Sequence, residues 1–237
     1  MDALIVIPAR ISSARLPRKM LADVKGKPLV VRTFESAKLA NAGDVVVACD
    51  CDEIASAIQN AGGKAVLTDP NLPSGTDRVF AAWKKLDPEG KYKFIINLQG
   101  DMPFIGADFV RSAVEDIKKT NCDIFTLGTP IKDDSYLRES VVKPLITFDS
   151  QNGGRALYFS RSAIPFGGPY FNHIGIYCFR AEGLRKFVGL PQSPLEKTER
   201  LEQLRAIENG MTIGVRIISA APPISVDTQE DLEALLN

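Results

Sequence analysis

Short apolar runs alternate with segments of helical period through the first half of the chain. Leu4–Ile7 is wholly apolar and ends at Pro8, a pattern typical of a strand buried on both faces. Similar runs predict strands at 45–48, 65–67 and 94–98, and helical spacing predicts helices at 28–40, 53–61, 76–86 and 108–119. Strands that alternate with helices form right-handed βαβ units, so we expect an α/β, Rossmann-like fold with a mostly parallel sheet flanked by helices.

The pattern changes after about Thr129. The segments 141–148, 156–160 and 174–179 have strand character with no helix-length segment between them, which predicts an antiparallel β insertion in the parallel core. Helical spacing then predicts one helix over 194–209 that stops at Gly210, a strand at 213–218 and a final helix capped by Thr228. Because no linker or repeat interrupts the chain, we expect a single domain, 1–237, in which 130–192 is the insertion.

The charge balance excludes some classes of function. Among the 237 residues, 29 are Lys or Arg and 29 are Asp or Glu, whereas general nucleic-acid binding needs a surplus of positive charge. No apolar run approaches the ~18 residues that span a bilayer, and the N-terminus lacks a basic leader segment. The four cysteines form no C-x-x-C pair, which disfavours a zinc site or a disulfide framework. We therefore expect a cytoplasmic protein that neither binds nucleic acid nor inserts into a membrane.

Polar clusters follow the predicted strands, where ligands of open α/β sheets bind. The first spans 8–19 and carries Arg10, Arg15, Arg18 and Lys19, although both the P-loop and the dinucleotide fingerprint are absent from the chain. This density of positive charge favours polyphosphate binding, with a solvated basic loop as the alternative. A second cluster, 73–78, opens a helix whose free N–H groups suit an anion.

Two carboxylates stand at further strand ends. Asp101 follows the strand at 94–98, and Asp227 lies at a strand-to-helix junction. Carboxylate oxygens together with phosphate oxygens are typical ligands of Mg²⁺, while helix capping is the alternative reading. A basic loop with two such carboxylates suits a metal–triphosphate site for in-line displacement at phosphorus.

As motifs, these clusters resemble the 3-deoxy-manno-octulosonate cytidylyltransferases, or CMP-KDO synthetases, in order and over nearly the whole chain. The matching stretches are 7–10, 13–19, 74–78, 97–103, 156–161, 173–177, 193–196, 201–205 and 226–228. The resemblance implies a nucleotidyltransferase domain, usually dimeric, that converts CTP and 3-deoxy-D-manno-octulosonate (KDO) into CMP-KDO and pyrophosphate for lipopolysaccharide biosynthesis. It also implies that the 130–192 insertion binds sugar or mediates dimerisation.

The resemblance assigns roles position by position. Lys19, Asp101 and Asp227 would be catalytic, and the two carboxylates would bind Mg²⁺. The nucleotide would be bound by Ala9, Arg10, Ser13, Arg15, Lys19, Ser74, Arg78 and Gln99. The sugar acid would be bound by Gln99, Arg161, His173, Tyr177, Glu202 and Gln203. Glu202 and Gln203 are adjacent on a helix, about 100° apart, so one of them could face solvent.

The chain departs from the family pattern at several positions. Arg18 stands where the family usually has Gly, and Met102 where Glu is common. The stretch 166–172 is shortened, and Asn172 replaces a usual basic residue before His173. These changes bear on loop conformation and on the exact sugar. The alternatives are therefore a cytidylyltransferase for 8-amino-KDO or another 2-keto sugar acid such as sialic acid, and a non-catalytic nucleotide-binding homologue.

Overall fold

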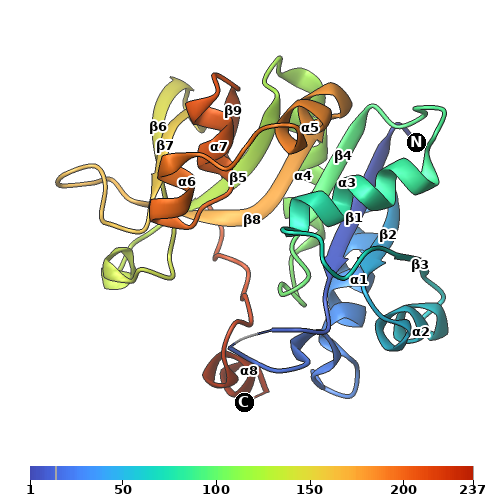
Figure 1. The fold of residues 1–237 in the computed structure, drawn as a ribbon. Helices are drawn as coiled ribbons and strands as arrows, with labels where there is room; N and C mark the ends of the chain where they lie inside the picture. The colour runs from blue at the N-terminus through green and yellow to red at the C-terminus, as the bar shows by residue number, and fades with distance from the viewer. Residues whose placement is uncertain (14, 237) are drawn as a thin grey trace. The chain divides into compact units, whose positions relative to one another are not determined.

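A computed structural model describes residues 1–13 and 15–236. Ala14, which belongs to the basic loop motif, and Asn237 lie outside the described residues. The chain forms two compact units, one made of residues 1–114 with 223–237 and the other of residues 115–222 (Figure 1). The second unit includes the whole 130–192 segment that the sequence marks as β-rich.

The first unit is built on a parallel sheet. Its strands lie in the order β3-β2-β1-β4, and each neighbouring pair runs parallel. The elements are β1 (Ala3–Ala9), η1 (Lys19–Leu21), α1 (Leu29–Leu39), β2 (Asp44–Cys49), α2 (Asp52–Asn60), β3 (Lys64–Leu67), α3 (Gly75–Leu86), β4 (Phe94–Leu98), α4 (Ala107–Lys119, which continues into the second unit) and α8 (Gln229–Leu236). These bounds confirm the strands and helices predicted for this half of the chain within a few residues.

Burial explains why the strands are apolar throughout. Every residue of β1 and of β4 is buried, as expected for strands covered on both faces. Helix α1 connects β1 to β2 and α2 connects β2 to β3, so the chain moves toward one edge of the sheet. Helix α3 then carries the chain back past β2 and β1 to β4, on the other side of β1. Since crossovers are right-handed, this reversal places α3 on the opposite face. The reversal makes the β1/β4 junction a topological switch point, at which ligands of such sheets bind.

The second unit contains a mixed sheet of order β8-β5-β9-β7-β6. Only the β5–β9 pair is parallel within this order; the β8–β5, β9–β7 and β7–β6 pairs of the described residues are antiparallel. The elements are β5 (Ile124–Pro130), η2 (Asp134–Leu137), β6 (Lys143–Ser150), β7 (Gly153–Ser160), β8 (Phe171–Arg180), α5 (Ala181–Val188), α6 (Pro194–Glu199), α7 (Gln203–Glu208) and β9 (Ile213–Ile217). The antiparallel strands predicted for this region are confirmed.

Some predictions for this unit are wrong or incomplete. The sequence reading assigned neither β5 nor α5. The single helix predicted over 194–209 is wrong, because Arg200 adopts a left-handed conformation, with φ of 56°, that ends α6 before α7 begins. The two short helices are joined by a buried ion pair, in which the guanidinium of Arg205 donates to Glu196 Oε1 at 2.5 Å.

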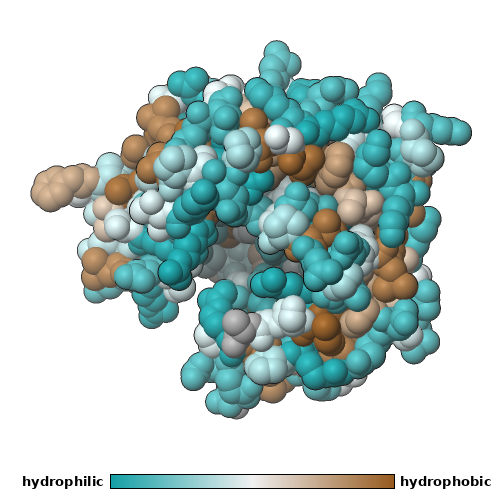
Figure 2. All heavy atoms as spheres, in the orientation of Figure 1, coloured by the Kyte–Doolittle hydropathy of each residue, from teal (hydrophilic) through white to brown (hydrophobic). Residues whose placement is uncertain are grey.

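Hydrophilic residues cover most of the face shown in Figure 2. Within residues 1–13 and 15–236, no helix combines the length and apolar character needed to cross a membrane. The loop between β7 and β8 extends away from the rest of the second unit (Figure 1), and its Phe166 side chain is fully exposed.

Candidate functional site

The loop after β1 meets the loop after β4 at the switch point of the first unit. Gly100 makes this approach possible, since a Cβ on it would lie 3.0 Å from the carbonyl oxygen of Pro8 and 3.1 Å from Met20 Sδ. The hydroxyl of Thr33 donates to the carbonyl of Gly100 at 2.9 Å and fixes the β4 loop to α1. The two predicted clusters therefore come together through backbone packing.

Lys19, Asp101 and Asp227 form the centre of this site. Lys19 Nζ donates to Asp101 Oδ2 and to Asp227 Oδ1, both at 3.0 Å. The Asp227 segment is placed by a backbone bond in which Val226 N donates to the carbonyl of Asp101 at 2.9 Å. The structure thus brings together the three residues for which the sequence predicts catalysis.

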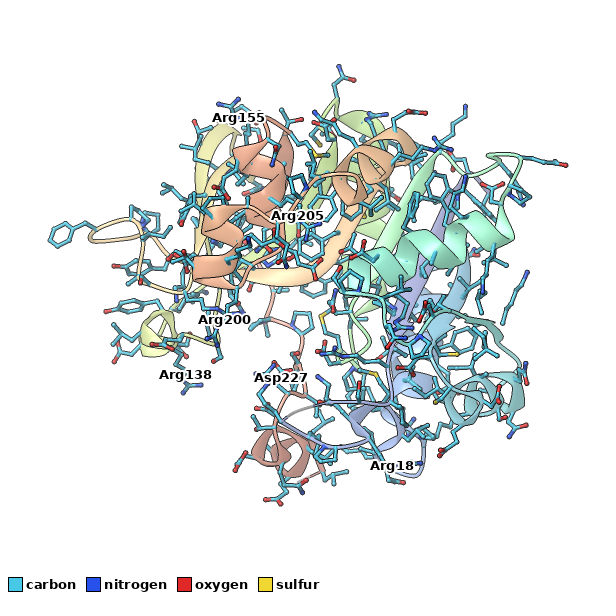
Figure 3. All side chains as sticks on the ribbon, viewed as in Figure 1. Arg18, Arg138, Arg155, Arg200, Arg205 and Asp227 are labelled. Carbon is cyan, nitrogen blue, oxygen red and sulfur yellow. The ribbon has the colours of Figure 1, made fainter. Side chains whose placement is uncertain are left out.

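The carboxylates determine the protonation of Lys19. Burial acts to lower the pKa of the Lys19 ammonium, but the charges of Asp101 and Asp227 and their hydrogen bonds outweigh burial, so its pKa is raised. Lys19 therefore remains positive at neutral pH and is available to a phosphate. Arg15 adds a second positive charge, because its guanidinium donates to Asp227 Oδ1 at 2.9 Å (Figure 3 labels Asp227).

The basic loop itself encloses a shallow cavity of about 460 Å³, lined by Arg10, Ile11, Ser12, Ser13, Pro17 and Arg18. Asp50, at the end of β2, holds this loop, since its Oδ1 accepts from Ile11 N at 2.9 Å. The sequence reading missed Asp50, although a carboxylate directly after a predicted buried strand was the available signal. Arg18, which also lines this cavity, pairs with Glu53 of α2.

Ser74 and Arg78, predicted for the nucleotide, have structural contacts. Ser74 is the N-cap of α3, because its hydroxyl accepts from Asp77 N at 3.2 Å. The guanidinium of Arg78 is buried and donates to Thr68 Oγ1 at 2.5 Å, with Asp50 Oδ2 at 3.9 Å. Arg78 thereby supports the segments that follow β2 and β3.

Gln99 closes a short polar chain at the end of β4. Its Nε2 donates to Asn97 Oδ1 at 3.3 Å, and Asn97 Nδ2 donates to Thr76 Oγ1 at 3.2 Å. Ala9, the last residue of β1, is 2% exposed, so only its backbone is placed to contact a nucleotide. The predicted nucleotide residues thus occupy the carboxyl ends of β1 and β4 and the start of α3.

His173, Tyr177 and Gln203 form a second cluster, in the second unit. The His173 and Tyr177 rings lie 5.2 Å apart, and Tyr177 donates its hydroxyl hydrogen to Gln203 Oε1 at 3.1 Å. Gln203 is 4% exposed, yet its Nε2 has no hydrogen-bond partner among the described residues. A buried amide donor without a partner is costly, so this group is suited to bind a ligand acceptor. Glu202, the neighbour of Gln203, is half-buried.

The position of the hydrogen on the His173 ring depends on Thr126, a residue that the sequence did not point to. The register of the β5–β8 ladder shifts between Thr126 and Leu127, and the Thr126 hydroxyl lies 2.9 Å from His173 Nε2. The carbonyls of Ile176 at 2.7 Å and of Ile174 at 3.2 Å compete for the single Thr126 hydrogen, which favours Thr126 as the acceptor from Nε2–H. His173 therefore keeps Nδ1 as an acceptor.

The burial of these rings shifts their pKa values. Burial lowers the pKa of His173 from 6.5 to about 3 and, together with the charge of Glu202, raises the pKa of Tyr177. Both rings are neutral near pH 7, and His173 is a weak base.

Arg161 lies beside this cluster and is occupied by backbone carbonyls. Its guanidinium donates to the carbonyl oxygens of Glu139 and Glu199, both at 2.8 Å, and of Arg200 at 3.4 Å. Its backbone N–H donates to the carboxylate of Glu199 at 2.9 Å. Arg161 thus fixes the loops around the cluster, with further N–H groups on its terminal nitrogens.

A separate cavity of about 670 Å³ lies near the start of β5 and the β6–β7 turn of the second unit. The Arg216–Asp116 ion pair, at 2.9 Å, lies on its wall. None of the predicted site residues lines it, and it brings no cluster of reactive groups together. We therefore assign the function to the two polar clusters.

Comparison with known proteins gives a consistent picture. A family model described as Cytidylyltransferase matches residues 4–213. A protein of Parvibaculum lavamentivorans named 3-deoxy-manno-octulosonate cytidylyltransferase is 48% identical over 232 residues, covering 97% of this chain and 90% of its own. A protein of the same name from Rhodospirillum centenum is 46% identical, covering 98% and 91%. A solved CMP:2-keto-3-deoxy-manno-octonic acid synthetase complexed with CTP has a TM-score of 0.89 and 35% identity, covering 100% of this chain and 97% of its own.

The first prediction concerns His173, the single histidine of the sequence. Its pKa in the folded chain, about 3, lies below the ordinary 6.5, so the unfolded chain binds the extra proton as pH falls. Stability is therefore fully present above about pH 6.5 and is lost toward pH 3, by up to about 1.4 kcal/mol per pH unit. His173→Gln should lose stability less steeply than wild type. Denaturant unfolding at pH 7.5, 6.0, 5.0 and 4.5 measures this, and parallel curves for both proteins would contradict it.

Proposed function

Because the chain belongs to the cytidylyltransferase family, and within it to the 3-deoxy-manno-octulosonate cytidylyltransferases, we propose that it transfers CMP from CTP to KDO. The anomeric 2-hydroxyl of KDO attacks the α-phosphorus, the bond to the β-phosphate breaks, and CMP-KDO and pyrophosphate leave. The observation that carries this proposal is the convergence of Lys19 with Asp101 and Asp227 at the switch point of the parallel sheet. The product would supply lipopolysaccharide biosynthesis.

The basic loop is suited to the triphosphate. Arg10 and Ser13 line the cavity after β1, and Ala9 and Arg15 belong to the same segment of the chain. Lys19 supplies a positive charge held in place by two carboxylates. As negative charge grows on the departing pyrophosphate, a fixed ammonium stabilises the transition state more than the ground state. Ser74, Arg78 and Gln99 would place the cytidine, with Arg78 acting by holding the neighbouring loops.

Asp101 and Asp227 fit a Mg²⁺ ion. Each carboxylate has one oxygen engaged by Lys19, and among the described residues no hydrogen bond uses Asp101 Oδ1 or Asp227 Oδ2. Hard carboxylate oxygens beside a phosphate-binding loop are the donor set that Mg²⁺ prefers. When bound, the ion would neutralise phosphate charge and favour displacement at the α-phosphorus.

The second cluster is suited to a sugar acid rich in hydroxyls. Gln203 Nε2 offers a donor, His173 Nδ1 an acceptor and Tyr177 a polar ring edge, and Arg161 and Glu202 would complete the contacts within this unit. His173 would orient the sugar and would not act as the general base, because a group with a pKa near 3 accepts protons poorly at neutral pH.

The proposal also covers the domain organisation, the oligomeric state and the cellular location of the chain. We propose that residues 1–237 act as one nucleotidyltransferase domain, with 130–192 binding sugar and contributing to a homodimer. Exposed apolar side chains on this segment support the role in a homodimer, among them Phe166 and Leu137, the latter 65% exposed. Sedimentation equilibrium tests this role, because a monomer would show that these side chains are merely surface residues. The free state of the four cysteines supports a reducing, cytoplasmic location.

The sugar acid decides between this proposal and its alternatives. Purified protein with CTP, Mg²⁺ and KDO should release pyrophosphate, with weaker turnover of 8-amino-KDO and sialic acid. Higher kcat/KM for 8-amino-KDO would reassign the substrate, and the absence of release with every 2-keto sugar acid would favour a non-catalytic nucleotide-binding homologue. Asn172, in place of a basic residue, is the position from which such a shift in specificity would arise.

Asp101→Asn and Asp227→Asn test the metal proposal. An amide lacks the charge of a carboxylate, and one electrostatic contact at a displacement centre is typically worth ~10²–10³ in rate, so each variant should lose at least that much kcat. Mg²⁺ titration followed by calorimetry in the presence of CTP should show weaker metal binding. Wild-type Mg²⁺ dependence and rate in either variant would remove that carboxylate from the metal site.

Lys19→Ala and Arg18→Ala separate two neighbouring cations. Lys19→Ala should raise KM for CTP and lower kcat about 10²-fold or more, since it removes charge beside the leaving group. Arg18→Ala should change either constant by less than about threefold, because it removes only an exposed ion pair to Glu53. Steady-state kinetics at varied CTP measures both, and equal losses would show that Arg18 also contacts the triphosphate.

A further inference from the structure

Lys143 is a buried lysine at the start of β6, and its side chain is 0% exposed. Lysine is seldom fully buried without an acidic partner, yet no ion pair among the described residues includes Lys143, although the charges of Glu199 and Glu139 act on it from farther away. Its Nζ donates instead to the carbonyl oxygens of Arg138 at 3.1 Å and Val141 at 2.6 Å, and also to that of Arg161. Every ammonium hydrogen is therefore used, and the side chain acts as a backbone tether.

Arg161 continues the tether from the opposite side. Its guanidinium donates to the carbonyls of Glu139, Glu199 and Arg200, so Lys143 and Arg161 together hold segment 138–141 against residues 161 and 199–200. We call these two cations and their carbonyl acceptors the carbonyl clamp. Figure 3 labels Arg138 and Arg200, which mark the two loops that the clamp joins.

The carbonyl clamp borders the His173 cluster on several sides. The carbonyl of Val142, next to Lys143, accepts from His173 N at 2.9 Å. Lys143 pairs with Ser160 in the β6–β7 ladder, directly before Arg161. Arg200, at the other end, is followed within three residues by Glu202 and Gln203. Each segment that the clamp fixes therefore carries, or adjoins, a residue proposed to contact the sugar acid.

We propose that Lys143 is a positioning residue for the sugar acid, which sets the loops of Arg161, His173 and Gln203 through the carbonyl clamp. This inference rests on the proposed function. An apolar residue at this position would leave three part-buried carbonyl oxygens without their donor, so the 138–141 segment would move toward water. Since Arg161 is bonded to that segment, its displacement would spread to the sugar-binding loops.

A purely structural role predicts a different result, and the chain offers a matched control. Arg180 is a second cation tethered to backbone carbonyls in the same unit, donating to Cys122 at 3.1 Å, to Ile117 at 3.3 Å and to Thr120. These acceptors lie at residues 117–122, outside the loops that the carbonyl clamp joins, although Arg180 itself ends β8, three residues after Tyr177. Removal of Arg180 should therefore lower stability without a change in sugar affinity.

The experiment compares Lys143→Met, Lys143→Arg and Arg180→Met with wild type. KM and kcat are measured for KDO and for CTP, KDO affinity is measured by calorimetry, and Tm by thermal unfolding. Lys143→Met should raise KM and Kd for KDO about tenfold or more, since small displacements of positioning groups weaken contacts strongly, with KM for CTP within about twofold. Lys143→Arg, which keeps the charge, should show a smaller rise, and Arg180→Met should lower Tm with both KM values unchanged.

Unchanged KDO constants in Lys143→Met, or an equal rise in Arg180→Met, would overturn the inference. If Lys143→Met does not fold, Lys143→Arg decides: a rise in KM for KDO supports positioning, and wild-type constants oppose it. Absence of pyrophosphate release in wild type would overturn the proposed function instead, so the two failures are distinguishable.

Discussion

The ion pairs of Lys19 with Asp101 and Asp227 are the interaction on which the candidate site depends. Two carboxylates brought to one place repel each other, and a buried ammonium needs negative partners, so each group is tolerable only because the others are present. Their convergence fixes three distant parts of the chain: the loop after β1, the loop after β4 and the segment before α8. It also leaves Asp101 Oδ1 and Asp227 Oδ2 without a hydrogen bond among the described residues.

The polar groups of the His173 cluster and of the carbonyl clamp are held mainly by neutral hydrogen-bond partners. His173, Tyr177 and Gln203 are neutral groups whose orientation is set by hydrogen bonds, and Lys143 and Arg161 are cations satisfied by carbonyl oxygens. Such an arrangement fixes direction, because a carbonyl accepts only along its lone pairs, and it leaves a buried donor on Gln203 for a ligand. Neutral, oriented donors and acceptors suit discrimination among sugar hydroxyls.

The departures of this chain from the family pattern have local physical explanations. Arg18 adopts a left-handed conformation, with φ of 56°, which explains why glycine is usual there, and its pairing with Glu53 offsets part of the strain. Met102 is 3% exposed, so the side chain that replaces a glutamate is an apolar group in the interior. The short 166–172 stretch contains the exposed Phe166 and ends in the first two residues of β8, so that Asn172 directly precedes His173.

The sequence by itself determined the alternation of strands and helices in the first unit, because strands buried on both faces must be apolar throughout and helices must keep one apolar stripe. It also predicted a site from Lys19 in the basic loop and from Asp101 and Asp227 at strand ends, and these are side chains that the structure brings together. Tertiary structure alone decided that Arg200 breaks the helix predicted over 194–209 and that Arg78 supports loops. It alone also placed the Thr126 hydroxyl beside His173 Nε2 and the Lys143 ammonium among backbone carbonyls. Local pattern reports which face of an element is buried, whereas a hydrogen bond between residues distant in the chain depends on strand register and loop path, which no local pattern encodes.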